Sequence, residues 1–574
     1  MSNEKMIKGA RILLECLSRL GVKEIFGYPG GAVIPIYDEL YSFKDIKHYF
    51  SRHEQGAVHE ADGYARSTGK VGVCLATSGP GATNLVTGIM TAHMDSIPLL
   101  AITGQVSSSL LGKDAFQESD ILGITVPITK MNYLIQDIKD LPRILREAYY
   151  IASTGRPGPV LVDIPRDIQL QEIPYEEFNK LYEKPFYLEG YNPVYAGHKG
   201  QIKTAIKMIK EAKQPLIIAG AGILKANAYK ELKEFVLRTN IPVAMTLLGL
   251  GSFPGNHDLA LGMIGMHGTT YANYSANEAD LIIAAGMRFD DRVTGNPEKF
   301  LLNAKIIHID IDPAEIGKNK LIDVPIVGDL KSVLTEFNEK IPKLSHSEWL
   351  KKIKNLKKEY SLIYEKTENN DRLIPQEILS EINKIAKGNV IVATDVGQHQ
   401  MWTAQYMTYE NPYSIITSGG AGTMGFGLPA AIGAQVANPD KRVIAIVGDG
   451  GFQMTFQELM MIKEYNLPVK IFIINNSYLG MVRQWQELFH DKRYSSVDLS
   501  YNPDFIKIGE AYGIKSIQLK TKKDLKKHLK KILESDEAVL VECIVEKEEN
   551  VYPMIPAGKD VSQLVGKRGV LENE

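Results

Sequence analysis

The chain has 574 residues, of which 44% are hydrophobic and 23% are charged, and its formal net charge is -2. This composition is typical of a globular protein of about two to four domains, and it gives no reason to expect nucleic acid or a membrane as a partner. Three widely spaced cysteines predict no disulfide framework, and the N-terminal pattern lacks signal-peptide or transit-peptide character. We therefore expect a cytoplasmic protein, or one of an organelle stroma if it is encoded there.

Apolar runs typical of strands alternate with helical patterns along the whole chain. This alternation predicts an α/β fold with parallel sheets. Two segments lack the alternation: 175–200 is rich in proline and aromatic residues, and 341–372 is rich in Lys and Glu. Both are typical of crossings between domains. We expect three parallel-sheet α/β domains followed by a short tail, with the limits 1–180, 195–340, 372–545 and 546–574.

In the first expected domain, short apolar runs break at turns that lead into helical patterns. These turns are YPGG at 28–31, RHEQ at 52–55 and SGPGATN at 78–84. Glu54 therefore falls at a strand-to-helix junction. A first-turn glutamate that the helix dipole favours explains this position without any catalytic role, so both interpretations stay open here.

The second expected domain carries weaker signs of a nucleotide site. A Gly-Ala-Gly turn at 220–222 follows an apolar run, and Asp310 closes a later one. Both features occur in dinucleotide-binding folds, but each is often structural. The block RFDDRVTG at 288–295 is more distinctive.

The third expected domain contains a strand, helix, strand unit over 443–476. Two apolar runs, 443–447 and 469–474, flank an amphipathic segment at 455–465. Asp449 and Asn476 follow these runs directly, at the sheet edge where open α/β sheets bind ligands. Two side-chain oxygens without Cys or His suit Mg²⁺, which shares its oxygen ligands with substrate phosphates. The unit therefore predicts a diphosphate held through Mg²⁺, although either turn alone would be ordinary.

The GDG turn at 448–450 and the Asn pair at 475–476 resemble the signature of thiamine diphosphate (ThDP) enzymes. In that family the Asp, the second Asn and a carbonyl two residues later hold the metal, which implies Asp449, Asn476 and Tyr478. The turns YPGG, RHEQ and SGPGATN, with AFQE at 115–118, resemble in order the pyrimidine-binding domain of the same enzymes. The resemblance implies that Glu54 contacts the aminopyrimidine ring in a water-poor site.

The block at 288–295, together with 251–256 and 262–273, resembles the FAD-binding middle domain of the acetohydroxyacid synthase (acetolactate synthase) large subunits. The likeness extends over nearly the whole chain. It implies the following ThDP contacts: Pro29, Glu54, Gln398, His399, Gly422, Met424, Gly448, Asp449, Gly450 and Asn476. It implies the following contacts to an FAD whose role is largely structural: Arg156, Gly220, Gly222, Thr246, His267, Gly286, Arg288, Asp290, Arg292, Asp310 and Asp329.

The reaction that the resemblance implies joins two 2-oxo acids. Pyruvate is decarboxylated on ThDP, and the hydroxyethyl group is ligated to a second pyruvate or to 2-oxobutyrate. The products, 2-acetolactate and 2-aceto-2-hydroxybutyrate, are precursors of isoleucine, valine and leucine. Arg292 should hold the carboxylate of the second substrate, and Trp485 should shape its pocket. The remaining residues expected around that pocket are Gly31, Phe116, Gln117 and Met481.

Three alternatives remain. An FAD-containing pyruvate oxidase or a 2-oxo acid decarboxylase would share the fold but would bind no second carboxylate, so Arg292 and Trp485 argue against both. A non-catalytic cofactor-binding paralogue need not keep Glu54, Asp449 and Asn476 together. The family also implies a homodimer or homotetramer in which Glu54 and Asp449 of one chain serve different active sites. It leaves open a separate small regulatory subunit.

Overall fold

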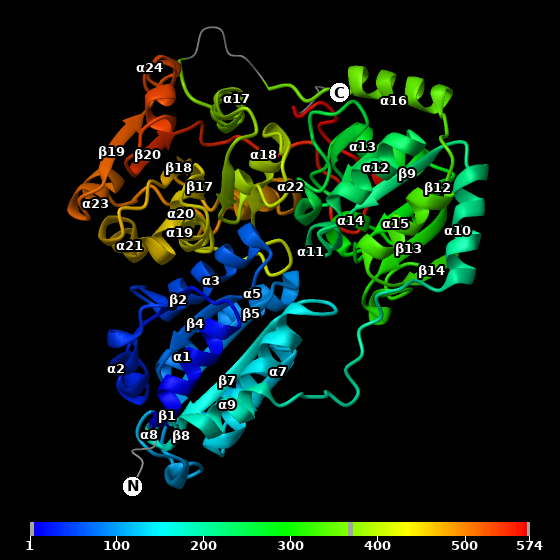
Figure 1. The fold of residues 1–574 in the computed structure, drawn as a ribbon. Helices are drawn as coiled ribbons and strands as arrows, with labels where there is room; N and C mark the ends of the chain where they lie inside the picture. Colours follow the sequence, from blue (N-terminus) through cyan, green and yellow to red (C-terminus); the bar gives the residue numbers. More distant parts are fainter. Residues whose placement is uncertain (1–4, 365–370, 571–574) are drawn as a thin grey trace.

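The computed structural model describes residues 5–364 and 371–570. It contains three six-stranded parallel sheets, each covered by helices, which form three lobes (Figure 1). The expected fold class, three parallel-sheet α/β domains, is confirmed. Within the described residues, none of the helices combines the length and the apolar character needed to span a bilayer.

The N-terminal sheet has the strand order β3-β2-β4-β5-β7-β6. Its strands are β2 (Glu24–Gly27), β3 (Lys47–Phe50), β4 (Gly72–Ala76), β5 (Leu99–Gln105), β6 (Met131–Leu134) and β7 (Pro159–Pro165). The helices of this lobe are α1 (Gly9–Arg19), α2 (Ile34–Ser42), α3 (Glu54–Thr68), α4 (Pro80–Thr83), α5 (Val86–Asp95), α6 (Ile121–Thr125), α7 (Leu141–Ser153), α8 (Arg166–Leu170) and α9 (Tyr175–Glu183). A small antiparallel pair, β1 (Met6–Lys8) with β8 (Glu172–Pro174), ties the start of the lobe to its end.

The middle sheet has the order β11-β10-β9-β12-β13-β14. Its strands are β9 (Pro215–Ala219), β10 (Val243–Met245), β11 (Ala260–Met263), β12 (Leu281–Ala285), β13 (Lys305–Asp310) and β14 (Val324–Val327). The helices of this lobe are α10 (Lys199–Glu211), α11 (Gly222–Lys225), α12 (Tyr229–Thr239), α13 (Thr270–Glu278), α14 (Asp291–Thr294), α15 (Leu330–Lys340) and α16 (Ser347–Glu359).

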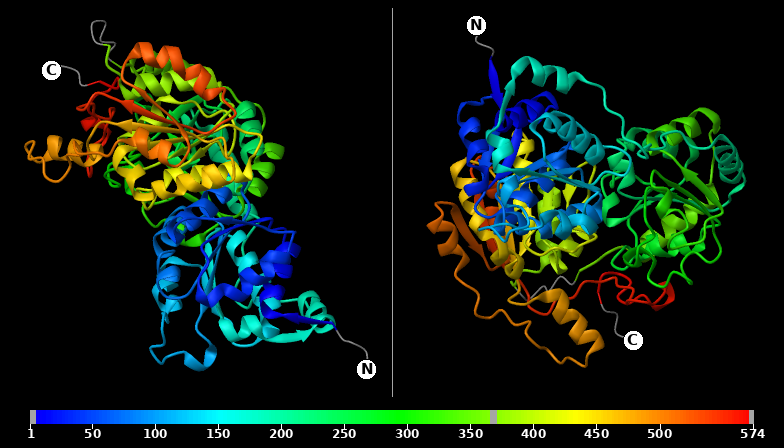
Figure 2. Two further views of the ribbon diagram at one scale, coloured as in Figure 1. Left: turned by 90° about the vertical axis from the view of Figure 1, so that its left-hand side faces the viewer. Right: turned by 90° about the horizontal axis from the view of Figure 1, so that it is seen from below.

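The C-terminal sheet has the order β16-β15-β17-β18-β20-β19. Its strands are β15 (Ile391–Thr394), β16 (Ile415–Ile416), β17 (Val443–Gly448), β18 (Lys470–Asn475), β19 (Lys515–Leu519) and β20 (Val539–Ile544). The helices are α17 (Pro375–Ala386), α18 (Gln398–Tyr406), α19 (Gly427–Ala437), α20 (Asp449–Thr455), α21 (Leu459–Glu464), α22 (Gly480–Phe489), α23 (Phe505–Ala511) and α24 (Lys522–Leu533). Helix α22 projects from this lobe (Figure 2).

The N-terminal and C-terminal lobes meet where α3 packs against α19. Two glycines allow the close approach: a Cβ on Gly63 would lie 2.1 Å from the carbonyl oxygen of Ala430. A Cβ on Gly433 would lie 1.8 Å from the carbonyl oxygen of Glu60. Both distances are far below van der Waals contact, so side chains at these two positions would force the helices apart. The α3–α19 contact therefore fixes how the two lobes are oriented.

The segment expected as one helix over 455–465 is divided. Helix α20 begins at Asp449 and ends at Thr455, a 3-10 turn covers Phe456–Glu458, and α21 follows. The interruption accompanies a contact between lobes, because the backbone N–H of Arg52 donates to the Glu458 carboxylate at 2.9 Å. The GDG turn is thus the first turn of a helix rather than a separate loop.

The segment after β20 leaves the C-terminal lobe and runs against the middle lobe (Figure 1). The N–H of Ile555 donates to the carbonyl of Met266, and Met554 exchanges backbone hydrogen bonds with Val565. Tyr552 and Met554 pack with Met266 and Trp485 into a small apolar cluster. The expected tail is therefore an ordered strap between two lobes.

Candidate functional site

A small cavity lies at the carboxyl ends of β15, β17 and β18. Helices α18 and α22 begin beside it, so their free N–H groups favour an anion there. Its lining includes the predicted residues Gln398, His399, Met424, Gly448, Asp449, Gly450, Asn476, Tyr478 and Met481. The strand-end edge thus brings the predicted diphosphate and metal residues together.

Asp449 is buried, and burial raises the pKa of its carboxyl to about 6. The side chain is held by Asn502, whose Nδ2 donates to Asp449 Oδ2 at 2.7 Å. Gln453 in turn donates to both Asn502 Oδ1 and the Asp449 carbonyl, at 2.9 and 3.0 Å. This network orients the carboxylate toward the cavity, although the sequence motif points only to Asp449 itself.

The loop after β18 presents further oxygen atoms. Asn476 Oδ1 accepts from the N–H of Tyr478 at 3.1 Å, and Ser477 between them has a φ of 58°. Among the described residues, no group of three or more His, Cys, Asp or Glu side chains could hold a metal ion. A metal here would therefore depend on one carboxylate, an amide, a carbonyl and ligand phosphates, a donor set that suits Mg²⁺.

Gln398 and His399 open α18 at the same cavity. The buried His399 Nε2 has no hydrogen-bond partner among the described residues, and burial lowers the pKa of the ring to about 3. A neutral imidazole with a free ring nitrogen fits a ligand oxygen in the cavity. Gln398 Nε2 donates to Gln484 Oε1 and to the Glu549 carbonyl, both at 2.9 Å. The C-terminal strap therefore contacts the cavity through Gln398.

A second cavity of about 1030 Å³ lies between the middle lobe and the two others. It is lined by ten of the eleven residues expected to contact FAD: Arg156, Gly222, Thr246, His267, Gly286, Arg288, Asp290, Arg292, Asp310 and Asp329. Gly220 lies just behind the lining, where a Cβ would approach the Gly286 carbonyl to 2.2 Å. The volume suits a cofactor of dinucleotide size.

Several of these side chains already have protein partners. Arg156 forms ion pairs with Asp312 and Glu315 at 3.0 and 2.6 Å. Asp290 caps α14 by accepting from the N–H groups of Arg292 and Val293. By contrast, the buried His267 Nδ1 has no partner among the described residues. The cavity therefore offers at least one polar atom that a ligand would satisfy.

Arg292, Met481 and Trp485 all line the large cavity. The Arg292 side chain is 59% exposed and lies near Asp291 and Met266, so much of its guanidinium remains accessible. Trp485 belongs to the apolar cluster of the C-terminal strap. Met481 also lines the small cavity, so α22 connects the two.

Apart from Arg156, the predicted residues of the N-terminal lobe lie away from both cavities. Glu54 begins α3 and is 8% exposed, and Asn84 Nδ2 donates to its Oε2 at 2.9 Å. Phe116 is 88% exposed, and a Cβ on Gly31 would meet nothing within 4 Å. Of the six predicted residues in the described part of this lobe, Arg156 lines the large cavity. The other five line neither cavity: Pro29, Gly31, Glu54, Phe116 and Gln117.

Comparison with known families accounts for all three lobes. Residues 7–124 match the N-terminal TPP binding domain of thiamine pyrophosphate enzymes. Residues 202–337 match the central domain of the same enzymes, and residues 395–543 match their C-terminal TPP binding domain. Thiamine pyrophosphate is another name for ThDP, so the two outer lobes are ThDP-binding domains.

Curated relatives are similar over almost the entire chain. The acetolactate synthase large subunit of Cyanidium caldarium is 49% identical, covering 98% of this chain and 97% of that protein. The large subunit of Lactococcus lactis subsp. lactis is 48% identical, covering 100% and 98%. A probable large subunit of Methanococcus aeolicus is 48% identical, covering 97% and 95%. The chain therefore belongs to the acetolactate synthase large-subunit family of ThDP-dependent enzymes.

Proposed function

We propose that this chain is the catalytic subunit of an acetolactate synthase. It decarboxylates pyruvate and ligates the two-carbon unit to a second pyruvate, giving 2-acetolactate, or to 2-oxobutyrate, giving 2-aceto-2-hydroxybutyrate. The observation that carries the proposal is the junction of the two cavities at α22. There Met481 lines both cavities, and Arg292 and Trp485 line the large one. A decarboxylase or an oxidase would need no cation for a second carboxylate.

The cofactors are ThDP, Mg²⁺ and FAD. Gln398, His399 and the turn at 448–450 would hold the diphosphate, and Asp449, Asn476 and the Tyr478 carbonyl would hold Mg²⁺. The large cavity would hold FAD, which the unpartnered His267 Nδ1 supports. When bound, ThDP supplies the electron sink for the loss of CO₂ from a 2-oxo acid.

The protein's own side chains bind and orient the acceptor 2-oxo acid, and they exclude water from the site. The Arg292 guanidinium pairs with the carboxylate of the acceptor 2-oxo acid, a charge-assisted contact that fixes its orientation. Trp485 forms one wall of the pocket for the side chain of the acceptor, and Met266, Tyr552 and Met554 pack against it. This apolar cluster keeps water from the reacting carbon, where a stray proton would divert the product to acetaldehyde.

The active site is assembled from two chains, in a homodimer or homotetramer. The Glu54 carboxylate, oriented by Asn84, would face the aminopyrimidine end of ThDP held by another subunit. The position of Glu54 outside both cavities of its own chain supports this arrangement. The proposal leaves open a separate small regulatory subunit. We retain 1–180, 195–340 and 372–545 as the domain limits, and a cytoplasmic or stromal location.

Purified protein with ThDP, Mg²⁺, FAD and pyruvate, but no electron acceptor, tests the activity. Acid converts acetolactate to acetoin, so a colour reaction should appear only in the acidified sample. Adding 2-oxobutyrate then measures acceptor choice. Acetaldehyde without acetoin would indicate a decarboxylase. Acetate or peroxide that requires an acceptor would indicate an oxidase, and either result would refute the proposal.

A further inference from the structure

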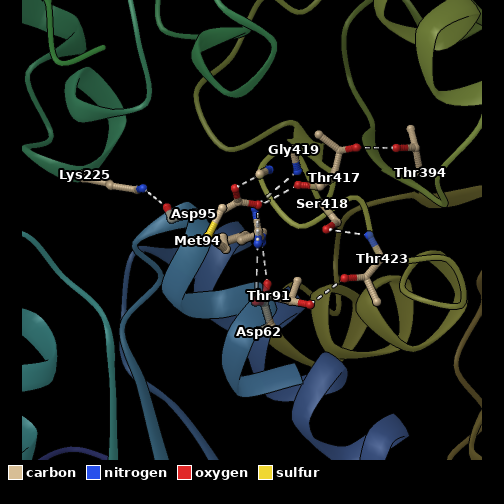
Figure 3. A network of polar contacts seen from close by, with 12 residues as sticks. Asp62, Thr91, Met94, Asp95, Lys225, Thr394, Thr417, Ser418, Gly419 and Thr423 are labelled. Atoms are coloured by element: carbon tan, nitrogen blue, oxygen red, sulfur yellow. Dashed lines mark hydrogen bonds and ion pairs between the residues drawn. The ribbon is translucent and has the colours of Figure 1, made fainter. Parts of the chain in front are cut away.

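Asp95, the last residue of α5, contacts all three lobes (Figure 3). Its carboxylate forms an ion pair with Arg66 of α3 at 2.9 Å. The same carboxylate accepts from the N–H groups of Gly419 and Gly420 at 3.0 and 2.7 Å. Its backbone carbonyl accepts from Lys225 Nζ of the middle lobe. Asp95 is 2% exposed, so these charge-assisted contacts form away from water, where they are strongest.

The glycines that Asp95 holds begin the loop 418–424. A Cβ on Gly420 would lie 2.8 Å from Asp95 Oδ1, so the carboxylate and the loop backbone are in close contact. Arg66 also holds Thr417, the residue just before the loop, by donating to its carbonyl at 2.8 Å. This end of the loop is therefore attached to the N-terminal lobe and not only to its own sheet.

Helix α5 also holds the other end of the loop. Thr91 is one turn before Asp95, so the two side chains lie on the same helix face. Its Oγ1 lies 2.6 Å from Thr423 Oγ1, and the Thr423 N–H donates to Ser418 Oγ at 3.0 Å (Figure 3). One face of α5 therefore contacts both ends of the loop.

The loop borders both cavities. Residues 418–422 line the large cavity, and Met424 lines the small one. On the proposed function, Gln398, His399 and the turn at 448–450 hold the diphosphate half of ThDP. Gly422 and Met424, which the family resemblance also places against ThDP, are therefore assigned to the other half, which carries the aminopyrimidine. A change in the loop should therefore affect one half of the cofactor more than the other.

We propose that Asp95 is a positioning residue for ThDP. Together with Thr91, it holds the loop 418–424 in the shape that receives the aminopyrimidine half. This inference rests on the proposed function for the identity of the ligand. A purely structural role of the same contacts would instead lower protein stability and weaken all ligands alike.

Two ligands distinguish these roles: ThDP with Mg²⁺, and inorganic pyrophosphate with Mg²⁺, which probes the diphosphate half alone. Their Kd values are measured by calorimetry on the full-length chain with FAD present. In Asp95→Asn, the Kd for ThDP should rise at least about tenfold, while the Kd for pyrophosphate should stay within about twofold. Thr91→Val keeps the side-chain shape and should raise the ThDP value about two- to fivefold. The exposed Asp45 provides a matched control, Asp45→Asn, which should change neither.

An equal rise of both Kd values in Asp95→Asn would overturn the inference. An unchanged Kd for ThDP in a folded Asp95→Asn would overturn it as well. If Asp95→Asn does not fold, Thr91→Val decides: a selective loss supports the positioning role, and wild-type binding refutes it. If wild-type protein binds ThDP but forms no acetolactate, the proposed activity fails. The positioning role would still be judged by the ratio of the two Kd values.

Discussion

At the scale of single residues, the proposed function makes the exposed Arg292 guanidinium the group that separates ligation from simple decarboxylation. In Arg292→Ala, kcat/KM for acetolactate formation should fall about 10- to 100-fold, because a charge-assisted contact to the acceptor carboxylate is lost. Release of CO₂ and acetaldehyde from pyruvate should persist, which product analysis measures. Arg143→Ala on α7, which breaks ion pairs with Asp140 and Glu147, provides the control. An unchanged acetolactate yield in Arg292→Ala would contradict the assignment.

His59 offers a test of stability. It is fully buried in α3 and lies edge-on to Phe426, with ring centroids 5.3 Å apart. Neither ring nitrogen has a hydrogen-bond partner among the described residues, and burial lowers the pKa of His59 to about 3. His59→Leu should therefore raise the free energy of unfolding by about 1–3 kcal/mol at pH 7, because an unsatisfied buried polar group is removed.

The difference in the free energy of unfolding between His59→Leu and the wild type should increase as the pH falls. The folded-state pKa of the wild-type ring is below its ordinary value of about 6.5, so the unfolded state binds more protons as pH falls below 6.5. The wild type then loses about 2 kcal/mol between pH 7 and pH 5 that the variant keeps. Urea unfolding at both pH values measures the gap. The exposed His198, changed to Leu, should show no such gap, and a pH-independent difference at His59 would contradict the burial argument.

At the scale of elements, the C-terminal strap connects the lobes and contacts Gln398 and Trp485. A chain that ends at Glu546 should bind ThDP more weakly and accept a second 2-oxo acid with a higher KM, since Gln484 loses its contacts with Val551. A chain that ends at Val570 should resemble the full-length protein. Calorimetry and the acetoin assay on the two truncations check this. Equal ThDP binding would show that the strap only covers the surface.

The elements also show what the sequence could predict. The apolar run at 443–447 forms β17 (Val443–Gly448), because a buried parallel strand requires an unbroken apolar run. The helix expected at 455–465 is interrupted where Glu458 meets Arg52, a partner 406 residues away. The strap has no periodic pattern, and its order depends on Met266 and Trp485. Local patterns therefore predict elements, but contacts between distant segments decide their ends.

The site residues also divide into those that the sequence indicates and those that only tertiary contacts reveal. The GDG and Asn-Asn turns indicate Asp449 and Asn476 because their chemistry is local to strand ends. Asn502, which orients the Asp449 carboxylate, follows no motif and comes from a segment 53 residues later. Asp95 likewise lies in a helix whose sequence is unremarkable, and only its contacts to three lobes distinguish it. The groups that position the site arise from tertiary packing, which a single sequence does not display.

At the scale of the whole molecule, the proposed function gives each chain two parts of an active site, and Glu54 does not line the small cavity of its own chain. Gln398, Asp449 and Asn476 line the small cavity, whereas Glu54 lies in the N-terminal lobe outside it. The packing of α3 against α19 holds the lobes in this relation, and Gly63 and Gly433 permit it. On the proposed function, a second chain brings a Glu54 carboxylate to each small cavity.

Mixed oligomers test this requirement. Glu54→Gln and Asp449→Asn should each reduce acetolactate formation at least about 100-fold when present in every chain. If sites form between two chains, a mixed dimer contains one site with both native residues and one with neither. Co-expression in equal amounts should then restore about a quarter of the wild-type activity, because half of the dimers are mixed and half of their sites are intact. If each site lay within one chain, every site would carry one substitution, and no activity would return. Tagging the two variants differently and purifying through both tags isolates the mixed dimer, in which the expected activity rises to about half.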